Sequence, residues 1–217
     1  MKIIEFNKTN TIFNQFISVI RNVAIQKDQL RFRRNCERMG EIFSYEISKT
    51  LDYSTKQVIT PLGTSDINTS DNQIVLATIL RAGLPLHQGM LNYFDGAENA
   101  FISAFRKHTD NDTDFTIESE YLACPDITNK TVLLSDPMLA SGASILAAYK
   151  ALLANGTPKQ LHVIVLIASQ QGIDFIQQHL PKNITLWVGA IDQEMNDKSY
   201  IIPGLGDAGD LAFGEKM

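Results

Sequence analysis

Cysteine is scarce in this chain, long apolar runs are absent, and positive charge is not in excess. Only Cys36 and Cys124 occur among 217 residues, with no CxxC motif and no Cys/His spacing that suits a metal. No apolar stretch approaches the ~20 residues that a membrane-spanning helix needs. The N-terminus, MKIIEFNKTN, also lacks the apolar stretch of a signal peptide. These absences predict a cytoplasmic protein in a reducing compartment, with no membrane partner.

The balance of charge argues against a nucleic-acid partner. The chain has 19 Lys and Arg residues against 24 Asp and Glu residues, which gives a net charge of −5. DNA or RNA would meet a repulsive overall field, and only a local basic patch could overcome it. We therefore expect no nucleic acid among the ligands of this protein.

Hydrophobic residues make up 44% of the chain, enough to build a sizeable core. The length suits one large domain, and no segment has the composition of a linker, an internal repeat or a low-complexity tract. We expect a single domain over residues 1–217. Its core would span about 70–190, with N-terminal helices and a C-terminal segment of about 191–217 packing on it.

Short apolar runs alternate with helical patterns in the second half of the chain. Ile74–Leu80 (IVLATIL) is a continuous apolar run, as expected for a strand that is buried on both faces. Similar runs lie at 131–134, 161–168 and 184–190, and helical patterns at 84–94, 147–153 and 173–180 separate them. This alternation predicts an α/β fold with a mostly parallel central sheet flanked by helices.

Other parts of the chain have different patterns. Phe32, Cys36, Met39, Phe43 and Ile47 are spaced as one face of a helix, and residues 51–72 favour β-structure rich in turns. Residues 108–129 are polar and acidic, without a clear period, and we expect them to form a long loop. Ligands of parallel sheets bind at the carboxyl ends of the strands, so the loops there are the candidate sites.

The loop after the second apolar run has the composition of a phosphate site. It reads SDPMLASGAS from Ser135 to Ser144, which is a strand end, an acid, small residues and then a helix start. Backbone N–H groups at a helix N-terminus favour an anion, and small side chains let it approach closely. Asp136 could take the hydroxyls of a ribose or hold a cation. An ordinary capped helix after a strand explains the same residues equally well.

Two arginines could neutralise a polyanion at the same edge. Arg81 directly follows the first apolar run, and Arg106 follows the apolar residues 100–105. Two guanidinium groups in one crevice suit a diphosphate. Each arginine taken singly is better explained as a surface residue.

The C-terminal segment YIIPGLGDAGD, residues 200–210, is rich in glycine and aspartate. It formally contains GxGxxG, but the few residues that follow leave no room for the helix and strand of a dinucleotide-binding unit. We predict instead a loop that wraps a flat ligand and binds it through main-chain N–H and C=O groups.

Together these three loops resemble the uracil phosphoribosyltransferase family. SDPMLASGAS is similar to that family's ribose-phosphate loop, DPMLATGGS. ILRAGLP is similar to its pyrophosphate loop, and YIIPGLGDAGD to its uracil-binding hood. The likeness extends to RFR at residues 31–33 and to Tyr45-Glu46, and it is weakest in residues 52–72 and 108–130.

The resemblance implies a type I phosphoribosyltransferase fold with a C-terminal hood, residues 191–217, that binds the base. The implied reaction converts uracil and phosphoribosyl pyrophosphate (PRPP) to UMP and diphosphate, in UMP salvage. It also implies Mg²⁺ as the cofactor, held mainly by PRPP and reached by Asp207 directly or through water. A homodimer or larger homo-oligomer is implied, while the choice between dimer and tetramer, and a GTP effector as in some relatives, stay open.

Residue roles carry over to the matching positions. Asp136 would hold the ribose hydroxyls, residues 140–144 would cradle the 5′-phosphate, and Arg81 and Arg106 would neutralise the departing diphosphate. Asp207, Arg106 and Asp136 are the implied catalytic residues. The residues implied to bind PRPP are Arg81, Arg106, Asp136, Pro137, Met138, Leu139, Ala140, Ser141, Gly142, Ala143, Ser144 and Asp207. Those implied to bind uracil are Ile201, Gly206, Asp207 and Ala208, mainly through their backbone.

Some positions depart from the family pattern, and other functions stay open. Ala143 replaces a glycine, which requires a negative φ there, and Leu211 replaces a cation. One alternative is a catalytically weak homologue that binds UMP or PRPP as a regulator, even of RNA, although the acidic charge opposes RNA binding. Another is a structural remnant of the family, which would be expected to lose Asp136, Gly142 or Asp207.

Overall fold

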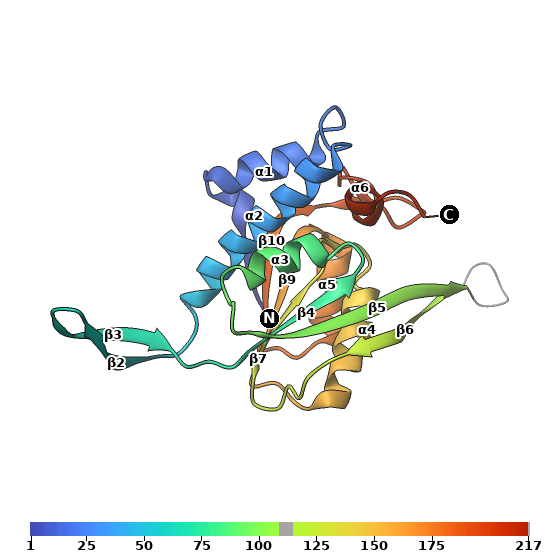
Figure 1. The fold of residues 1–217 in the computed structure, drawn as a ribbon. Coiled ribbons are helices and arrows are strands. Elements are labelled where there is room, and N and C mark those ends of the chain that lie inside the picture. Colours follow the sequence, from blue (N-terminus) through green and yellow to red (C-terminus); the bar gives the residue numbers. More distant parts are fainter. Residues whose placement is uncertain (109–114, 217) are drawn as a thin grey trace.

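The computed structural model describes residues 1–108 and 115–216 (Figure 1). In this part of the chain, a central sheet has the strand order β1-β10-β9-β7-β4-β5-β6, and β8 pairs with β9 in addition. All neighbours along that order are parallel except β5 and β6. Its strands are β1 (Lys2–Glu5), β4 (Ile74–Leu80), β5 (Glu98–His108), β6 (Phe115–Ala123), β7 (Thr131–Ser135), β8 (Met138–Leu139), β9 (Gln160–Ser169) and β10 (Thr185–Asp192). The predicted α/β fold with a mostly parallel sheet is confirmed.

Helices cover both faces of this sheet (Figure 1). On one face, α4 (Ala143–Leu152) and α5 (Gln170–His179) pack against side chains such as Val75 and Ala77. On the other face, α1 (Ile12–Arg21), α2 (Gln29–Ser48) and α3 (Leu84–Leu91) share a core with Leu76. The continuous apolar sequence of β4 follows from this burial, because successive side chains point to opposite covered faces.

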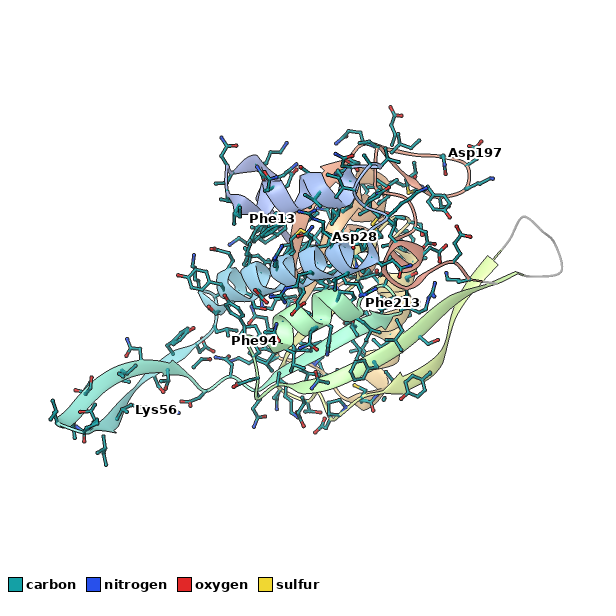
Figure 2. All side chains as sticks on the ribbon, turned by 45° about the horizontal axis from the view of Figure 1, so that its top comes forward. Phe13, Asp28, Lys56, Phe94, Asp197 and Phe213 are labelled. Atoms are coloured by element: carbon teal, nitrogen blue, oxygen red, sulfur yellow. The ribbon has the colours of Figure 1, made fainter. Side chains whose placement is uncertain are left out.

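The apolar stripe predicted for residues 32–47 is the buried face of α2. Phe32, Cys36, Met39, Phe43 and Ile47 are all nearly inaccessible to solvent. Asp28 caps the start of the helix, since its carboxylate accepts a hydrogen bond from Arg31 N at 3.0 Å. Phe13 of α1, labelled in Figure 2, packs edge-on against Phe43 of α2 with ring centroids 5.1 Å apart, which joins the two helices.

A hairpin of β2 (Tyr53–Thr60) and β3 (Gly63–Ser70) projects away from the sheet (Figure 1). This confirms the β-structure predicted for residues 51–72. Ile59 and Leu62 near its tip are 87% and 100% exposed, and Lys56 also points outward (Figure 2). The hairpin therefore holds its shape through its own ladder of hydrogen bonds and contributes little to the core.

Three parts of the fold differ from the sequence-based expectation. Residues 108–129 are not one long loop, because β6 occupies Phe115–Ala123 and pairs with β5. The short strand β1 joins the sheet at its edge beside β10. The hood contains β11 (Glu194–Met195), β12 (Ile201–Ile202) and the short helix α6 (Ala208–Phe213), where a loop alone was expected. The 3-10 turns η1 (Phe6–Lys8) and η2 (Leu153–Asn155) complete the described elements.

Two glycines let α2 and α3 approach closely. A Cβ atom on Gly89 would lie 1.9 Å from the carbonyl oxygen of Glu37, and one on Gly40 would lie 2.4 Å from that of Leu86. In both cases the Cβ atom would clash with backbone atoms, so rotation of a side chain cannot relieve the clash. The separation of the two helices, and with it the loop that precedes α3, depends on these absent side chains.

We expect Gly89→Ala to lower the free energy of unfolding by about 1–3 kcal/mol, because overpacking outweighs the gain of about 1 kcal/mol in helix propensity. Chemical denaturation measures the difference. Gly96→Ala is the matched control, because a Cβ atom at Gly96 meets nothing within 4 Å. Equal stability of the two variants would contradict the close packing of α2 on α3.

Candidate active site

A cavity of about 690 Å³ lies between the carboxyl ends of β4 and β7 and the hood. Its walls include Arg81 after β4, Asp136 after β7, Ser144 at the start of α4, and Asp207 of the hood. The loops that the sequence singled out thus meet in one place, as expected for the carboxyl edge of a parallel sheet.

Asp136 is a buried acid at the floor of this cavity. Only 9% of the residue is exposed, and its Oδ1 accepts a hydrogen bond from Met138 N at 3.3 Å. Burial raises the pKa of the Asp136 carboxyl to about 7, against a smaller lowering by that hydrogen bond. An acid in this state can accept hydrogen bonds from ligand hydroxyls once it is ionised.

The loop from Asp136 to Gly142 is held by neighbouring elements. The carbonyl of Pro137 accepts hydrogen bonds from Leu166 N and Ile167 N at 3.1 and 3.0 Å. The hydroxyl of Ser169 donates to the carbonyl of Ala140 at 2.6 Å and also accepts from Gly172 N, capping α5. The loop is therefore fixed in position before any ligand arrives.

Gly142 makes the turn into α4. Its φ of +85° is in the left-handed region, and a Cβ atom there would lie 2.7 Å from the ring of Phe175. Ala143, the next residue, is not among the described residues with positive φ, so the requirement set by its replacement of glycine is met. Ser144, in the first turn of α4, lines the cavity, and N–H groups in the first turn of a helix have no helical partners, which suits an anion.

Arg81 lines the cavity, but it also binds the hood. Its Nη2 lies 2.9 Å from Oδ1 of Asp210 on α6, and its Nη1 donates to the carbonyl of Gly214 at 3.3 Å. Its Nε is buried and has no hydrogen-bond partner among the residues that the structure describes. The guanidinium therefore joins the loop after β4 to the end of the chain.

Asp207 caps α6 at the cavity wall. Its Oδ1 accepts a hydrogen bond from Asp210 N at 3.0 Å. The apolar hood residues Ile201, Leu205 and Ala208 are buried in the core on the α1–α3 side, as is part of Leu211. The position where the family usually carries a cation thus contributes to packing in this chain.

The cavity includes most, though not all, of the residues singled out from the sequence. Those that line it are Arg81, Asp136, Met138, Ala140, Ser144, Ile201, Gly206, Asp207 and Ala208. Pro137, Leu139, Ser141, Gly142 and Ala143 belong to the same loop but do not form its walls. Arg106 lies on β5, three residues beyond the last one that pairs with β4, and its side chain lies outside the described part of the chain.

Some cavity residues had no signal in the sequence. Ser103 comes from β5, Ser199 directly precedes the hood motif, and Lys216 lies near the end of the chain. Lys216 supplies a positive charge to the cavity. Leu211, which replaces a cation of the family pattern, supplies none. The lysine follows the motif by several residues, and only the path of the chain after α6 brings it to the cavity.

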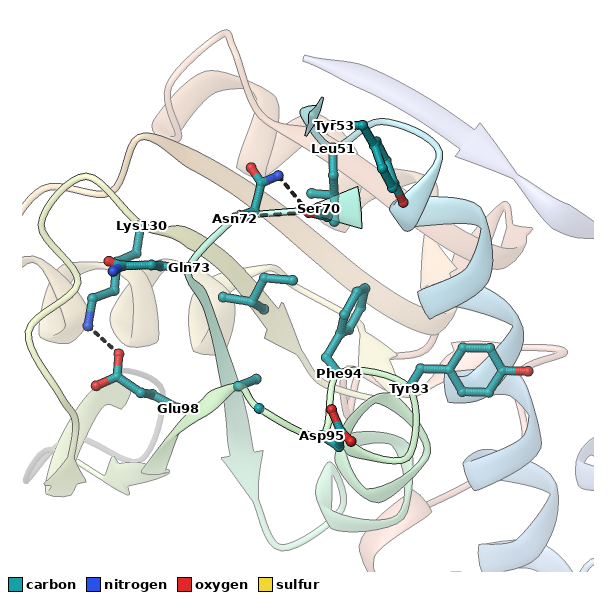
Figure 3. A pocket seen from close by; sticks show the side chains of 13 residues that line it. Leu51, Tyr53, Ser70, Asn72, Gln73, Tyr93, Phe94, Asp95, Glu98 and Lys130 are labelled. Atoms are coloured by element: carbon teal, nitrogen blue, oxygen red, sulfur yellow. Dashed lines mark hydrogen bonds and ion pairs between the residues drawn. The ribbon is translucent and has the colours of Figure 1, made fainter. Parts of the chain in front are cut away.

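A second cavity, of about 530 Å³, lies near the start of β4 and β5 and the base of the hairpin (Figure 3). Tyr53, Tyr93 and Phe94 line it, and an ion pair between Lys130 and Glu98 closes one side. It includes none of the residues that the sequence motifs singled out. The cavity-lining residues among those predicted from the motifs thus belong to the first cavity.

Metal and membrane features are absent from the part of the chain that the structure covers. Among residues 1–108 and 115–216, no group of three or more His, Cys, Asp or Glu side chains could hold a metal ion. The helices within the same ranges are too short or too polar to cross a bilayer.

A strand, a loop of small residues and a helix at the carboxyl edge of a parallel sheet, with a C-terminal hood across the cavity, are the arrangement of the phosphoribosyltransferase class. The AQ2163 protein from Aquifex aeolicus has a similar structure, with a TM-score of 0.86, 29% identity and coverage of 98% of each chain.

Sequence comparison identifies the family. The profile of the uracil phosphoribosyltransferase family matches residues 8–215. A uracil phosphoribosyltransferase of Porphyromonas gingivalis is 52% identical over the full length of both chains. One from Pyrococcus furiosus is 39% identical over 193 residues, which cover 88% of this chain and 82% of that protein. The chain belongs to the uracil phosphoribosyltransferase family.

The raised pKa of Asp136 makes stability depend on pH. Between about pH 4 and pH 7 the unfolded chain has lost this proton while the folded chain retains it, so the contribution of Asp136 to stability falls as pH rises. Asp136→Asn stays neutral and avoids this loss. In thermal unfolding of the ligand-free protein, we expect the variant to gain stability relative to wild type between about pH 5 and pH 8.

Asp126→Asn is the control for this titration. Asp126 is exposed, and hydrogen bonds from Thr128 lower the pKa of its carboxyl. The difference in stability between Asp126→Asn and wild type should therefore stay constant over the same pH range. A difference for Asp136→Asn that is equally flat would show that Asp136 is already ionised in the folded protein.

Proposed function

We propose that this chain transfers the phosphoribosyl group of PRPP to uracil, forming UMP and diphosphate, and so acts in UMP salvage. The observation that carries the proposal is the single cavity in which Asp136 and the start of α4 face Gly206 and Asp207 of the hood. Full-length similarity to uracil phosphoribosyltransferases supports the same activity.

The phosphoribosyl group would bind along the loop after β7. Its 5′-phosphate accepts hydrogen bonds from N–H groups at residues 140–144, where the dipole of α4 favours negative charge. Its ribose hydroxyls donate to the Asp136 carboxylate. The contacts of Ser169 and Gly172 with this loop support the proposal. They hold the loop in place beforehand, so that binding does not have to order it.

Departure of diphosphate is the demanding step. The C1′–O bond breaks, positive character develops on the ribose ring, C1′ bonds to N1 of uracil, and the N1 proton leaves. Arg81 and Lys216, which line the cavity, are the cations we assign to the leaving group, and the family resemblance adds Arg106. No strong nucleophile is required.

Magnesium fits the oxygen donors of the cavity. Mg²⁺ usually keeps several waters and binds one or two carboxylates together with substrate phosphates. Asp207 lines the cavity and is the residue we assign to it, through water. When bound, the ion would reduce the negative charge of the diphosphate.

Uracil would be read by the main chain of Ile201, Gly206 and Ala208. Its N3–H and two carbonyl groups form a fixed donor and acceptor pattern that backbone groups can match. Cytosine would place a donor against a donor and leave buried groups unpaired, which can cost several orders of magnitude in specificity.

We also propose a homo-oligomer. The exposed apolar side chains of the hairpin, Ile59, Leu62 and Ile67, support it, because a second copy of the chain could cover them.

The first test of the proposed activity is UMP formation from labelled uracil, PRPP and Mg²⁺, with cytosine, hypoxanthine and orotate in parallel. We expect turnover of uracil alone. A folded protein that binds UMP but converts none of the four bases would favour the regulatory homologue instead.

Asp207→Asn tests the role of the hood acid. Asparagine is an equally good helix cap, so α6 should keep its start while the charge is lost. We expect kcat/KM to fall by about 100-fold or more with an unchanged thermal midpoint. Asp197→Asn, in the exposed turn of the hood, is the control (Figure 2). Normal activity of Asp207→Asn would remove Asp207 from the reaction.

A further inference from the structure

An ion pair between α1 and the end of β10 forms hydrogen bonds with one residue of the hood, Gly204. Arg21 is the last residue of α1, and Asp192 is the last residue of β10. The guanidinium binds the carboxylate through two nitrogens, with Nη1–Oδ2 at 2.7 Å and Nη2–Oδ1 at 2.9 Å. The two side chains are only 20% and 8% exposed, so water screens the pair little.

Both main-chain polar groups of Gly204 bind this pair. The N–H of Gly204 donates to Oδ2 of Asp192 at 3.0 Å, and its carbonyl accepts from Nη1 of Arg21 at 3.0 Å. One peptide segment is thus held from its donor side by the acid and from its acceptor side by the base. The φ of Gly204 is +54°, and a Cβ atom there would lie 2.2 Å from the carbonyl oxygen of Ile201.

A second contact holds the next residue. The side-chain amide of Gln26 donates to the carbonyls of Ile20 and Leu205, both at 2.9 Å. Residues 201–206 therefore lie between a buried Ile201 side chain, the ion pair and the connection between α1 and α2. None of these contacts involves a residue of the cavity wall other than Ile201.

We propose that Arg21 and Asp192 are positioning residues for the base, which they serve by holding the hood backbone in register. The inference rests on the proposed function. If the main chain of the hood binds uracil, no side chain can rotate to improve these hydrogen bonds. Their geometry therefore depends on where the backbone of Gly206 and Ala208 lies. A misplacement of about 1 Å can cost about 100-fold in rate. Ser169, whose hydroxyl holds the loop after β7, lies beside Asp192 in the sheet, but the Asp192 carboxylate bonds to Arg21 and to Gly204 of the hood. We therefore expect a change of the Asp192 side chain to act first on the hood.

Asp192→Asn is the sharpest variant. It keeps the shape of the side chain, but its amide nitrogen would face either Gly204 N–H or the Arg21 guanidinium, a donor against a donor. We expect kcat/KM for uracil to fall by about 10- to 100-fold, while KM for PRPP changes by about two-fold or less. Arg21→Lys keeps the charge but loses the bidentate geometry of the guanidinium. Its kcat/KM for uracil should lie between those of Asp192→Asn and wild type.

Asp52→Asn is the matched control. Asp52 also pairs with a cation, Lys159, at 2.9 Å, but Asp52 is exposed. It lines a different cavity from the one that the hood lines. Its kinetics should equal those of wild type. Equal losses for uracil and PRPP in Asp192→Asn, with a lowered thermal midpoint, would reduce the ion pair to a general stabilising contact and overturn the proposal.

Hydrogen exchange separates this inference from the proposed activity. In the ligand-free protein, Asp192→Asn should speed amide exchange in residues 201–206 and leave residues 136–144 protected as in wild type. Unchanged exchange in the hood would refute the positioning role. A wild-type protein inactive towards uracil would instead refute the proposed function, and the exchange result would still decide the role of Arg21 and Asp192 in holding the hood.

Discussion

Burial of both faces of the central sheet is the constraint on which the other features depend. Side chains of β4, β7, β9 and β10 point into two apolar cores, so most polar residues of these strands lie near the strand ends, with Thr78 and His162 as buried exceptions. At the carboxyl edge, Arg81 follows β4 and Asp136 follows β7, and Ser169 ends β9. The candidate site is therefore a consequence of the topology as much as of the individual motifs.

Two kinds of support hold the two halves of the cavity. The loop after β7 is fixed locally, by hydrogen bonds from β9 and by the close approach of Gly142 and Gly172 to their neighbours. The hood is fixed by distant segments: Arg33 of α2 donates to the carbonyl of Ala212 at 2.6 Å and lies over the ring of Phe213. One half of the site thus belongs to the sheet, and the other depends on the N-terminal helices.

Local patterns in the sequence were sufficient for the core of the fold. The strand predicted at Ile74–Leu80 is confirmed to the residue, because a strand covered on both faces needs an uninterrupted apolar run. The edge strands were missed for the opposite reason. β1 has only four residues, and β6 carries polar and acidic residues that a sheet edge tolerates, so neither has a strong pattern.

For the site, the three motifs found the loops, but the residues that hold them have no local signal. Ser169 and Gly172 are an ordinary helix start in the sequence, and Arg21 and Asp192 are separated by 171 positions. The helix α6 was missed because AGDLAF is short and follows glycines; its capping by Asp207 and its packing on α2 stabilise it. Such dependence on tertiary contacts cannot be deduced from spacing.

The way the chain closes on itself has a consequence for its folding during synthesis. The first strand, β1, pairs with β10, and the helices that follow it bind residues near the end of the chain. While the ribosome is still making the middle of the protein, β1 lacks its partner β10, and the apolar surfaces of α1 and α2 that pack on later strands and on α6 are open to solvent. The hood side of the cavity can assemble only after the last residues emerge, so its contacts of long sequence separation form late.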